Sequence, residues 1–131
     1  MSEPEFKYVI SFGTFCITSM ILKKLKFKQF SCPFDWVFSS TKMIADCLED
    51  NFTKFLDKKY YIPNKKKRGC GHTIYGGSCF NHYNPLLNPD HYDYYVRCVD
   101  RFRKTLTSTD YKLFISSCIT NTTKIQATHL T

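Results

Sequence analysis

The spacing of the hydrophobic positions changes several times along the chain, and each change predicts a new element. Residues 8–12 form a short apolar, β-prone run that predicts a buried strand ending at Gly13. From residue 14 to residue 26 the apolar side chains recur at helical spacing, with lysines opposite them. The predicted apolar face of this helix consists of Ile17, Met20, Ile21 and Leu25. The pattern therefore predicts a strand, a glycine turn and a helix, with Cys16 in the first turn of the helix.

Two more helices and a second strand follow. Ser39 or Ser40 is suited to cap a helix whose apolar positions continue to Leu56. Asn88 and Pro89 predict the start of a long amphipathic helix. Residues 112–115 predict a buried strand, whereas the glycine-rich and basic stretch 57–80 predicts a loop or irregular hairpin. We expect an α/β (or α+β) domain over residues 1–117, with three main helices on a small sheet, and a disordered or divergent tail over 118–131.

Composition narrows the class of protein. A chain of 131 residues that is 43% hydrophobic predicts one domain with a packed core. The abundance of Lys, Phe, Tyr, Ile and Asn is typical of an AT-rich genome, such as that of a large DNA virus or an AT-rich microbe. The net charge of +8 is concentrated in two basic clusters, at 23–28 and 65–68. Because no groove-reading motif accompanies them, we interpret both clusters as solvated surface and expect nucleic-acid binding to be weak and non-specific at most.

The cysteines indicate a reducing compartment. There are seven of them, which is an odd number, and no signal peptide precedes them. The sequence also lacks an apolar run of the ~18 residues that a membrane span requires. We therefore expect reduced thiols, no membrane partner and a cytoplasmic location, which would be the host cytoplasm if the protein is encoded by a virus.

Cys16 is the candidate nucleophile. The reactive form of cysteine is the thiolate, and the free N–H groups and dipole at a helix N-terminus favour negative charge. A nucleophilic cysteine also needs a base, which is usually a histidine. His82 is the candidate base, in the stretch between the predicted hairpin and the last helix. The alternative interpretation is that Cys16 is a small buried residue without chemistry.

Five segments carry a family resemblance. Ser11–Cys16, Phe30–Ser39, Phe80–His82, Val96–Phe102 and Lys112–Ile115 occur in an order that resembles a domain-of-unknown-function family of proposed papain-like cysteine peptidases. The resemblance covers about residues 8–116, and its most specific parts are Pro-Phe-Asp-Trp and Arg-x-x-x-Arg-Phe. It implies a papain-like fold and a hydrolase that acts on a peptide or another acyl substrate without a cofactor. In that family Cys16 would be the nucleophile and His82 the general base, with four possible orienting or pocket residues: Asp35, Trp36, Asn84 and His72.

Three alternatives compete with these assignments. Members of the family continue past the Lys112–Ile115 strand, so this copy resembles a C-terminally truncated one, and an inactive paralogue would act as a basic module that binds protein or nucleic acid. Asp35 could simply bond nearby backbone N–H groups in its turn, and Trp36 could pack in the core. A zinc site would use Cys70, His72, Cys79 and His82. We expect no metal, because the first pair has Cys-x-His spacing rather than that of the usual zinc motifs.

Overall fold

The first sheet in the computed structural model contains one parallel and one antiparallel pair of strands. The structure describes residues 5–12, 16–66, 68–118 and 124–129, and for 117, 118 and 124–129 only the backbone. Strand β1 (Tyr8–Ser11) pairs in parallel with β5 (Lys112–Cys118), so that Ile10 lies opposite Phe114. Strand β6 (Lys124–His129) pairs antiparallel with the other edge of β5, which gives the order β1-β5-β6. The two predicted strands are therefore neighbours, and each carries a buried side chain into the core.

Part of the segment 118–131, which we expected to be a disordered or divergent tail, forms a strand. Residues 124–129 form β6, and Phe114 of β5 lies opposite Thr128. The alternation of Ile125 and Ala127 with polar residues is the spacing of a strand, but it is too short a signal to separate from a loop. As a consequence, β5 is the central strand of its sheet rather than an edge strand.

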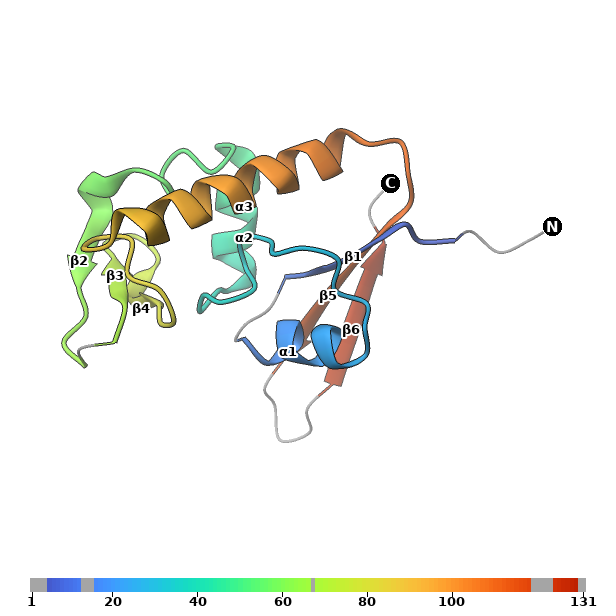
Figure 1. Cartoon of the computed structure of the whole chain (residues 1–131), viewed down its shortest axis with the longest axis horizontal. Coiled ribbons are helices and arrows are strands. Elements are labelled where there is room, and N and C mark those ends of the chain that lie inside the picture. Colours follow the sequence, from blue (N-terminus) through green and yellow to red (C-terminus); the bar gives the residue numbers. More distant parts are fainter. Residues whose placement is uncertain (1–4, 13–15, 67, 119–123, 130–131) are drawn as a thin grey trace.

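Helix α1 (Ile17–Lys24) follows β1 and contacts both β1 and β5 (Figure 1). The predicted apolar face of this helix was wrong. Ile17 and Met20 are 46% and 54% exposed, whereas Ser19 is fully buried. The buried face also contains Thr18 and Leu22. A polar residue can occupy this face because the Ser19 hydroxyl accepts a hydrogen bond from the Lys28 ammonium at 2.9 Å.

Helix α2 (Thr41–Glu49) begins where the sequence predicts. The Ser40 hydroxyl accepts a hydrogen bond from Met43 N at 3.1 Å, which makes Ser40 the N-cap. The helix ends earlier than the predicted Leu56, because Asn51 and Phe52 both adopt positive φ angles, of 55° and 62°. Turns then carry Phe52 and Phe55 into the core, at a spacing that resembles a helix.

The stretch predicted to be a loop or irregular hairpin forms a second sheet. A 3-10 turn (Lys58–Tyr60) leads into β2 (Tyr61–Pro63), which pairs antiparallel with β3 (Cys70–His72), and β3 pairs with β4 (Gly76–Phe80). Gly69, just before β3, has a φ of 58°, and a Cβ there would lie 1.7 Å from the Phe80 carbonyl oxygen. Any other residue at this position would collide with the Phe80 backbone and would need a strained φ angle, so the turn into β3 requires glycine.

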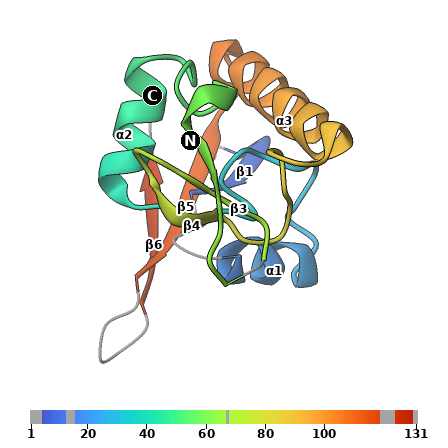
Figure 2. The same ribbon diagram turned by 90° about the vertical axis from the view of Figure 1, so that its left-hand side faces the viewer.

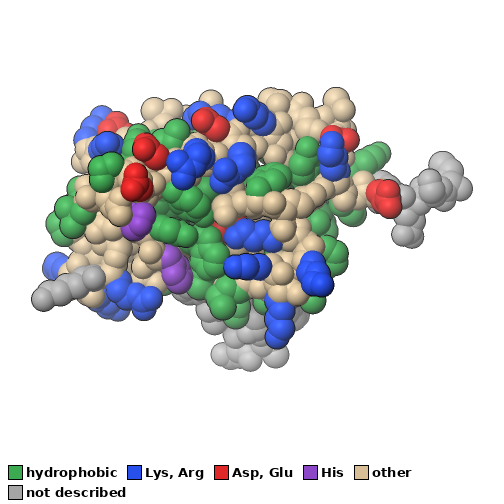
Figure 3. All heavy atoms as spheres, in the orientation of Figure 1, with side chains coloured by type: hydrophobic (Ala, Val, Ile, Leu, Met, Phe, Trp, Pro, Cys, Tyr) green, Lys and Arg blue, Asp and Glu red, His purple; other side chains and the backbone are tan. Residues whose placement is uncertain are grey.

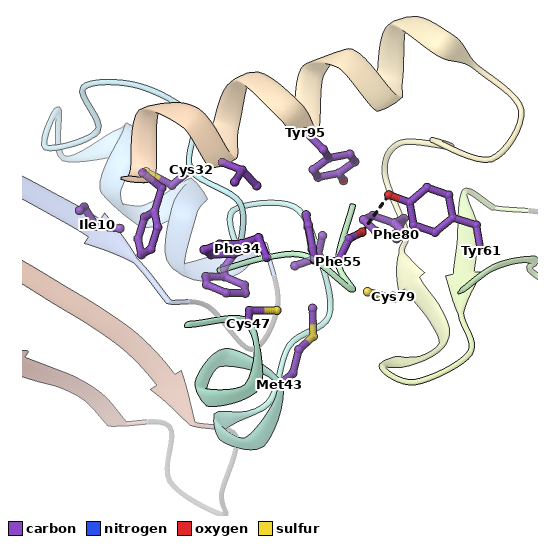
Figure 4. Packing of buried hydrophobic residues seen from close by; sticks show 14 of the residues in the cluster. Ile10, Cys32, Phe34, Met43, Cys47, Phe55, Tyr61, Cys79, Phe80 and Tyr95 are labelled. Carbon is purple, nitrogen blue, oxygen red and sulfur yellow. Dashed lines mark hydrogen bonds between the residues drawn. The ribbon is translucent and has the colours of Figure 1, made fainter. Parts of the chain in front are cut away.

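Helix α3 (Pro89–Thr107) extends along both sheets, as Figures 1 and 2 show. The Asn88 side chain accepts a hydrogen bond from Asp90 N at 2.9 Å, and Pro89 is the first helical residue, as predicted. Figure 2 shows α2 and α3 on either side of the strands, with α1 below them. Part of the aromatic core that these elements enclose is drawn in Figure 4. Its fully buried phenylalanines are Phe34, Phe52, Phe55, Phe80, Phe102 and Phe114.

Candidate active site

Cys16 occupies the position that the sequence predicts for it, at the start of α1. After β1 the chain remains attached to the sheet through Phe12 N, which donates to the Ile115 carbonyl at 2.8 Å. The predicted glycine turn at residues 13–15 lies outside the described residues. Cys16 is the N-cap residue of α1, and its carbonyl accepts from Met20 N at 3.0 Å. Its side chain makes no capping hydrogen bond and is partly exposed, so the thiol is available for chemistry at a helix N-terminus.

The other described cysteine side chains have a different environment. Five of them are buried, and burial raises the pKa of each thiol, that of Cys47 to about 12. These five are Cys32, Cys47, Cys70, Cys79 and Cys98. A buried thiol with a raised pKa stays protonated and unreactive near neutral pH. Cys16 is therefore set apart by its exposure as well as by its place in the chain.

Asp35 is fixed within its own turn. Its Oδ2 accepts a hydrogen bond from Cys32 N at 2.9 Å, which confirms the interpretation that this carboxylate bonds the backbone of the Cys32–Trp36 turn. The same oxygen lies 3.0 Å from Lys28 Nζ. Burial raises the pKa of Asp35, while the Lys28 ammonium and the Cys32 N–H act in the opposite direction. The Asp35 side chain is 3% exposed and that of Lys28 is 14% exposed, so this ion pair is almost fully withdrawn from water.

Lys28 is the residue of this site that the sequence did not indicate. It lies in the basic cluster that we interpreted as solvated surface, yet its ammonium contacts three groups: the Asp35 carboxylate, the Ser19 hydroxyl at 2.9 Å and the ring of Trp36 at 4.8 Å. A lysine among other lysines carries no sequence signal that separates a buried from an exposed side chain. On the face that Figure 3 shows, Lys and Arg side chains lie in several separate groups with hydrophobic side chains between them.

Trp36 and His82 are in contact. Their ring centroids are 5.3 Å apart at an interplanar angle of 67°, an edge-to-face arrangement. The contact exists because the segment after Trp36 pairs with the end of β4: Val37 forms an isolated bridge with Phe80, and Phe38 N donates to the Cys79 carbonyl at 2.9 Å. Trp36 is half-buried and His82 is exposed, so both rings remain accessible at the surface.

The segment that holds Trp36 also reaches the strand that leads to Cys16. The Ser39 hydroxyl donates to the Phe12 carbonyl at 3.3 Å, directly after the end of β1. The chain from Trp36 to Ser39 is therefore attached to the His82 loop at one end and to the end of β1 at the other. Among the described residues no hydrogen bond joins the Cys16 sulfur to the His82 ring. Catalytic hydrogen bonds of this kind are often long in a ligand-free protein and shorten when substrate binds.

His72 and Asn84 lie apart from Trp36 and His82, in contacts that support the backbone. His72 is fully buried, its Nε2 pairs with the Lys54 carbonyl at 2.8 Å, and its Nδ1 accepts from Ile74 N at 3.2 Å. Burial lowers the pKa of His72, which favours the neutral ring that these contacts require. Asn84 Oδ1 accepts from Leu87 N at 3.1 Å, in the turn before α3.

The residues of the zinc hypothesis do not come together as a ligand set. In the part of the chain that the structure describes, no group of three or more His, Cys, Asp or Glu side chains is placed to hold a metal ion. Both ring nitrogens of His72 are already bonded to the backbone. His82 contacts Trp36 instead.

A shallow surface pocket of about 360 Å³ lies beside Trp36. Lys28 and Trp36 form part of its wall, together with Tyr83, the residue after His82. Two further aromatic and basic side chains, Tyr94 and Lys23, extend this wall. The pocket therefore places accessible surface next to the histidine loop.

Fold and site together define a mixed α/β protein with a cysteine at the start of a helix and a histidine in a nearby loop. The segment Trp36–Ser39 contacts both the strand that precedes the cysteine and the strand that precedes the histidine. A family model described as "Putative papain-like cysteine peptidase (DUF1796)" matches residues 7–130, and the chain belongs to that family. No curated protein and no solved structure matched the chain. The family match extends to residue 130 and gives no support to the expectation of a C-terminal truncation. None of the helices in the described part of the chain has the length and hydrophobicity to cross a membrane.

Proposed function

We propose that the protein is a cysteine-nucleophile hydrolase that cleaves an acyl bond, most simply a peptide bond, with Cys16 as nucleophile and His82 as general base. The observation that carries this proposal is the contrast among the cysteines. Cys16 is partly exposed at a helix N-terminus with a side chain that makes no capping bond, whereas the other five described thiols are buried. Membership in a family of proposed papain-like peptidases supports the same assignment.

The reaction has two halves. His82 takes the proton from the Cys16 thiol, the sulfur attacks the substrate carbonyl carbon, and a new C–S bond forms as the carbonyl oxygen gains negative charge. The N–H groups in the first turn of α1 supply donors for that oxygen. His82 then returns its proton to the leaving amine, the C–N bond breaks, and a thioester remains. In the second half His82 accepts a proton from water as the water oxygen attacks the thioester carbonyl carbon. The C–S bond then breaks and His82 returns the proton to the sulfur, which leaves a carboxylic acid and the free thiol.

An activated ester tests the proposal without knowledge of the natural substrate. We expect p-nitrophenyl acetate to release p-nitrophenol and to acetylate Cys16, as detected by mass spectrometry of peptides from the quenched protein. Cys16→Ala should abolish this acetylation, and His82→Ala should slow it by about 10²–10⁴-fold, which is the usual contribution of general acid–base catalysis. His91→Ala is the control for disturbance of this loop, because the half-buried His91 accepts a hydrogen bond from Asn84 N through Nδ1 at 2.8 Å, and it should slow acetylation far less than His82→Ala. Equal acetylation rates in His82→Ala and the unchanged protein would overturn the proposal.

A second candidate function is that of a non-catalytic binding module. The observation that favours it is the exposed apolar surface of and after α1, where Ile17, Met20, Leu25 and Phe27 are between 46% and 57% exposed. Lysines lie among them, at positions 23, 24 and 26. A binding module of this kind would retain its partner in Cys16→Ala. If the partner were nucleic acid, we expect weak, sequence-independent binding that falls steeply between about 50 and 200 mM salt, because counterion release is its source.

A further inference from the structure

The ion pair between Lys28 and Asp35 is exceptional among those in the described residues. Every other ion pair has side chains that are at least 24% exposed, whereas these two are 14% and 3% exposed. Moving two charges out of water costs several kcal/mol, and an apolar pair of similar volume would often be as stable. The burial of this ion pair is therefore not explained by a gain in stability. Its contacts with neighbouring segments indicate a second role.

One side of the ion pair is bonded to the helix that begins at Cys16. Lys28 Nζ donates to the hydroxyl of Ser19, which lies one helical turn after Cys16 and is fully buried. The backbone of the same lysine is also tied to α1, since Lys28 N donates to the Leu22 carbonyl at 3.2 Å. The ammonium therefore fixes the rotation of α1 about its axis, and with it the direction in which the Cys16 side chain leaves the helix.

The other side of the ion pair is bonded to the aromatic support of His82. Asp35 holds Lys28 at 3.0 Å, the Lys28 ammonium lies 4.8 Å from the centre of the Trp36 ring, and that ring contacts the His82 ring at 5.3 Å. A cation over an indole face is among the stronger contacts of its type, especially where water is excluded. The Asp35 turn is itself anchored to α3, because Arg101 Nε and Nη2 donate to the Ser31 carbonyl at 3.2 and 3.1 Å.

We propose that Lys28 and Asp35 are positioning residues, whose buried ion pair holds the helix that begins at Cys16 and the loop that carries His82 in the arrangement required for proton transfer. This inference rests on the proposed function for its catalytic meaning. Its physical content is that the ammonium touches both supports, Ser19 for the nucleophile and Trp36 for the base. Lys28 has no direct role in the chemistry, because its charge is neutralised by Asp35 and its neighbour Ser19 is inaccessible to substrate.

The first test measures coupling between Lys28 and His82. Lys28→Met removes the charge but keeps the aliphatic stem, and we expect it to slow acetylation of Cys16 by p-nitrophenyl acetate by about tenfold or more, since small misplacements of reacting groups have effects of that size. In the Lys28→Met background, His82→Ala should then cost less than in the unchanged protein, by about the factor that Lys28→Met costs alone, so that the double variant is no slower than His82→Ala. Such non-additivity is the signature of residues that act as a unit, and general destabilisation does not produce it. Equal effects of His82→Ala in both backgrounds would overturn the proposal.

Two matched variants accompany this test. Lys28→Arg keeps the charge and the ability to stack on Trp36, and should restore most of the rate. Lys104→Met removes an exposed lysine of α3 and should leave the rate unchanged. A Lys104→Met rate as low as that of Lys28→Met would contradict the proposal, because it would attribute the effect to loss of positive charge in general rather than to the ion pair.

The second test needs no activity, and so separates a failure of this inference from a failure of the proposed function. The centre of the His82 ring lies 5.3 Å from that of the Trp36 ring, within reach of its ring current, so the His82 NMR signals, assigned with His82→Ala, should lie away from random-coil positions. Lys28→Met should move them toward random-coil values, while Lys104→Met should not. If Lys28→Met does not fold, Asp35→Asn removes the charge with little change in shape, and we expect the same movement. Unchanged His82 signals in a folded Lys28→Met or Asp35→Asn protein would overturn the proposal, whether or not Cys16 is acetylated.

Discussion

Substitution of His72 should lower the stability of the protein, whereas substitution of His82 should lower its activity and leave its stability almost unchanged. This difference separates a structural histidine from a catalytic one. His72 is fully buried between Tyr75 and Tyr60, at ring distances of 4.4 and 5.4 Å. Its Nδ1 accepts from two backbone N–H groups, of Ile74 and Tyr75, so Nε2 carries the proton and donates to the Lys54 carbonyl. His72→Phe keeps an aromatic ring in the stack and removes these hydrogen bonds.

The expected loss of stability for His72→Phe follows from the groups left without partners. Each lost hydrogen bond contributes about 0.5–1.5 kcal/mol net, and a buried polar group left unpaired costs about 1–3 kcal/mol. We therefore expect His72→Phe to lower the free energy of unfolding by about 2–4 kcal/mol, out of the roughly 5–15 kcal/mol that holds a domain of this kind. His82→Ala changes an exposed side chain and should cost less than about 0.5 kcal/mol.

The pH dependence of the same variant provides an independent check. Burial lowers the pKa of His72, so the native state favours the neutral ring and unfolding takes up a proton in acid. The resulting contribution to stability is present above the unfolded pKa of about 6.5, and it is lost as the pH falls through the folded value. Protonation of Nδ1 would also place its new N–H group against the backbone N–H groups of Ile74 and Tyr75, from which Nδ1 now accepts hydrogen bonds. The unchanged protein should therefore lose stability below pH 6.5 more steeply than His72→Phe.

Urea unfolding followed by circular dichroism at pH 7.5 and at pH 5.5 measures both effects, and the fluorescence of Trp36, the single tryptophan, supplies a second probe. The free energy of unfolding and its change between the two pH values are compared for the unchanged protein, His72→Phe and His82→Ala. A His72→Phe protein as stable as His82→Ala at pH 7.5, with the same loss at pH 5.5 as the unchanged protein, would refute the assignment of His72 to a backbone-supporting role.

Three further predictions concern the fold. Asn88→Ala should destabilise the protein by about 0.5–2 kcal/mol in the same urea assay, because it removes the acceptor that caps α3, and Asn88→Asp should restore most of the loss. Phe34→Ala should cost about 3–5 kcal/mol, because Phe34 is fully buried among aromatic rings, and a loss below about 1 kcal/mol would contradict its place in the core. A chain shortened to residues 1–118 should self-associate in analytical ultracentrifugation, because loss of β6 exposes the edge of β5, and a monomeric, fully stable product would contradict the strand order.

The parts of the fold that the sequence predicted are those with a local signal. Asn88 and Pro89 mark the start of α3 through a side-chain cap and a ring suited to the first helical position. Strand β1 and most of β5 have short apolar runs of the right length. The place of Cys16 at the start of α1 follows from the same local rules, and the cap at Ser40 confirms another of them.

The parts that the sequence did not predict depend on contacts between distant segments. The helical spacing of Phe52 and Phe55 continues past the end of α2, because turns with positive φ carry these rings into the core in place of a helix. The β2–β3–β4 sheet consists of short strands without alternation. The burial of Lys28 depends on Asp35 and Ser19, and nothing in the lysine cluster itself indicates these partners. The contact between Trp36 and His82 likewise depends on the bridge between Val37 and Phe80.

The assignment of Cys16 as nucleophile and His82 as its base is tested most directly by the rate at which each cysteine reacts with iodoacetamide between pH 5 and pH 9, resolved site by site by mass spectrometry. We expect Cys16 to react far faster than Cys47 and Cys98 throughout this range, because its thiol is partly exposed, whereas theirs are buried and burial raises their pKa values. His82→Ala should slow the labelling of Cys16 while the other cysteines keep their rates. A Cys16 that labels no faster than Cys47 or Cys98, or whose profile is the same in His82→Ala, would contradict the catalytic pair.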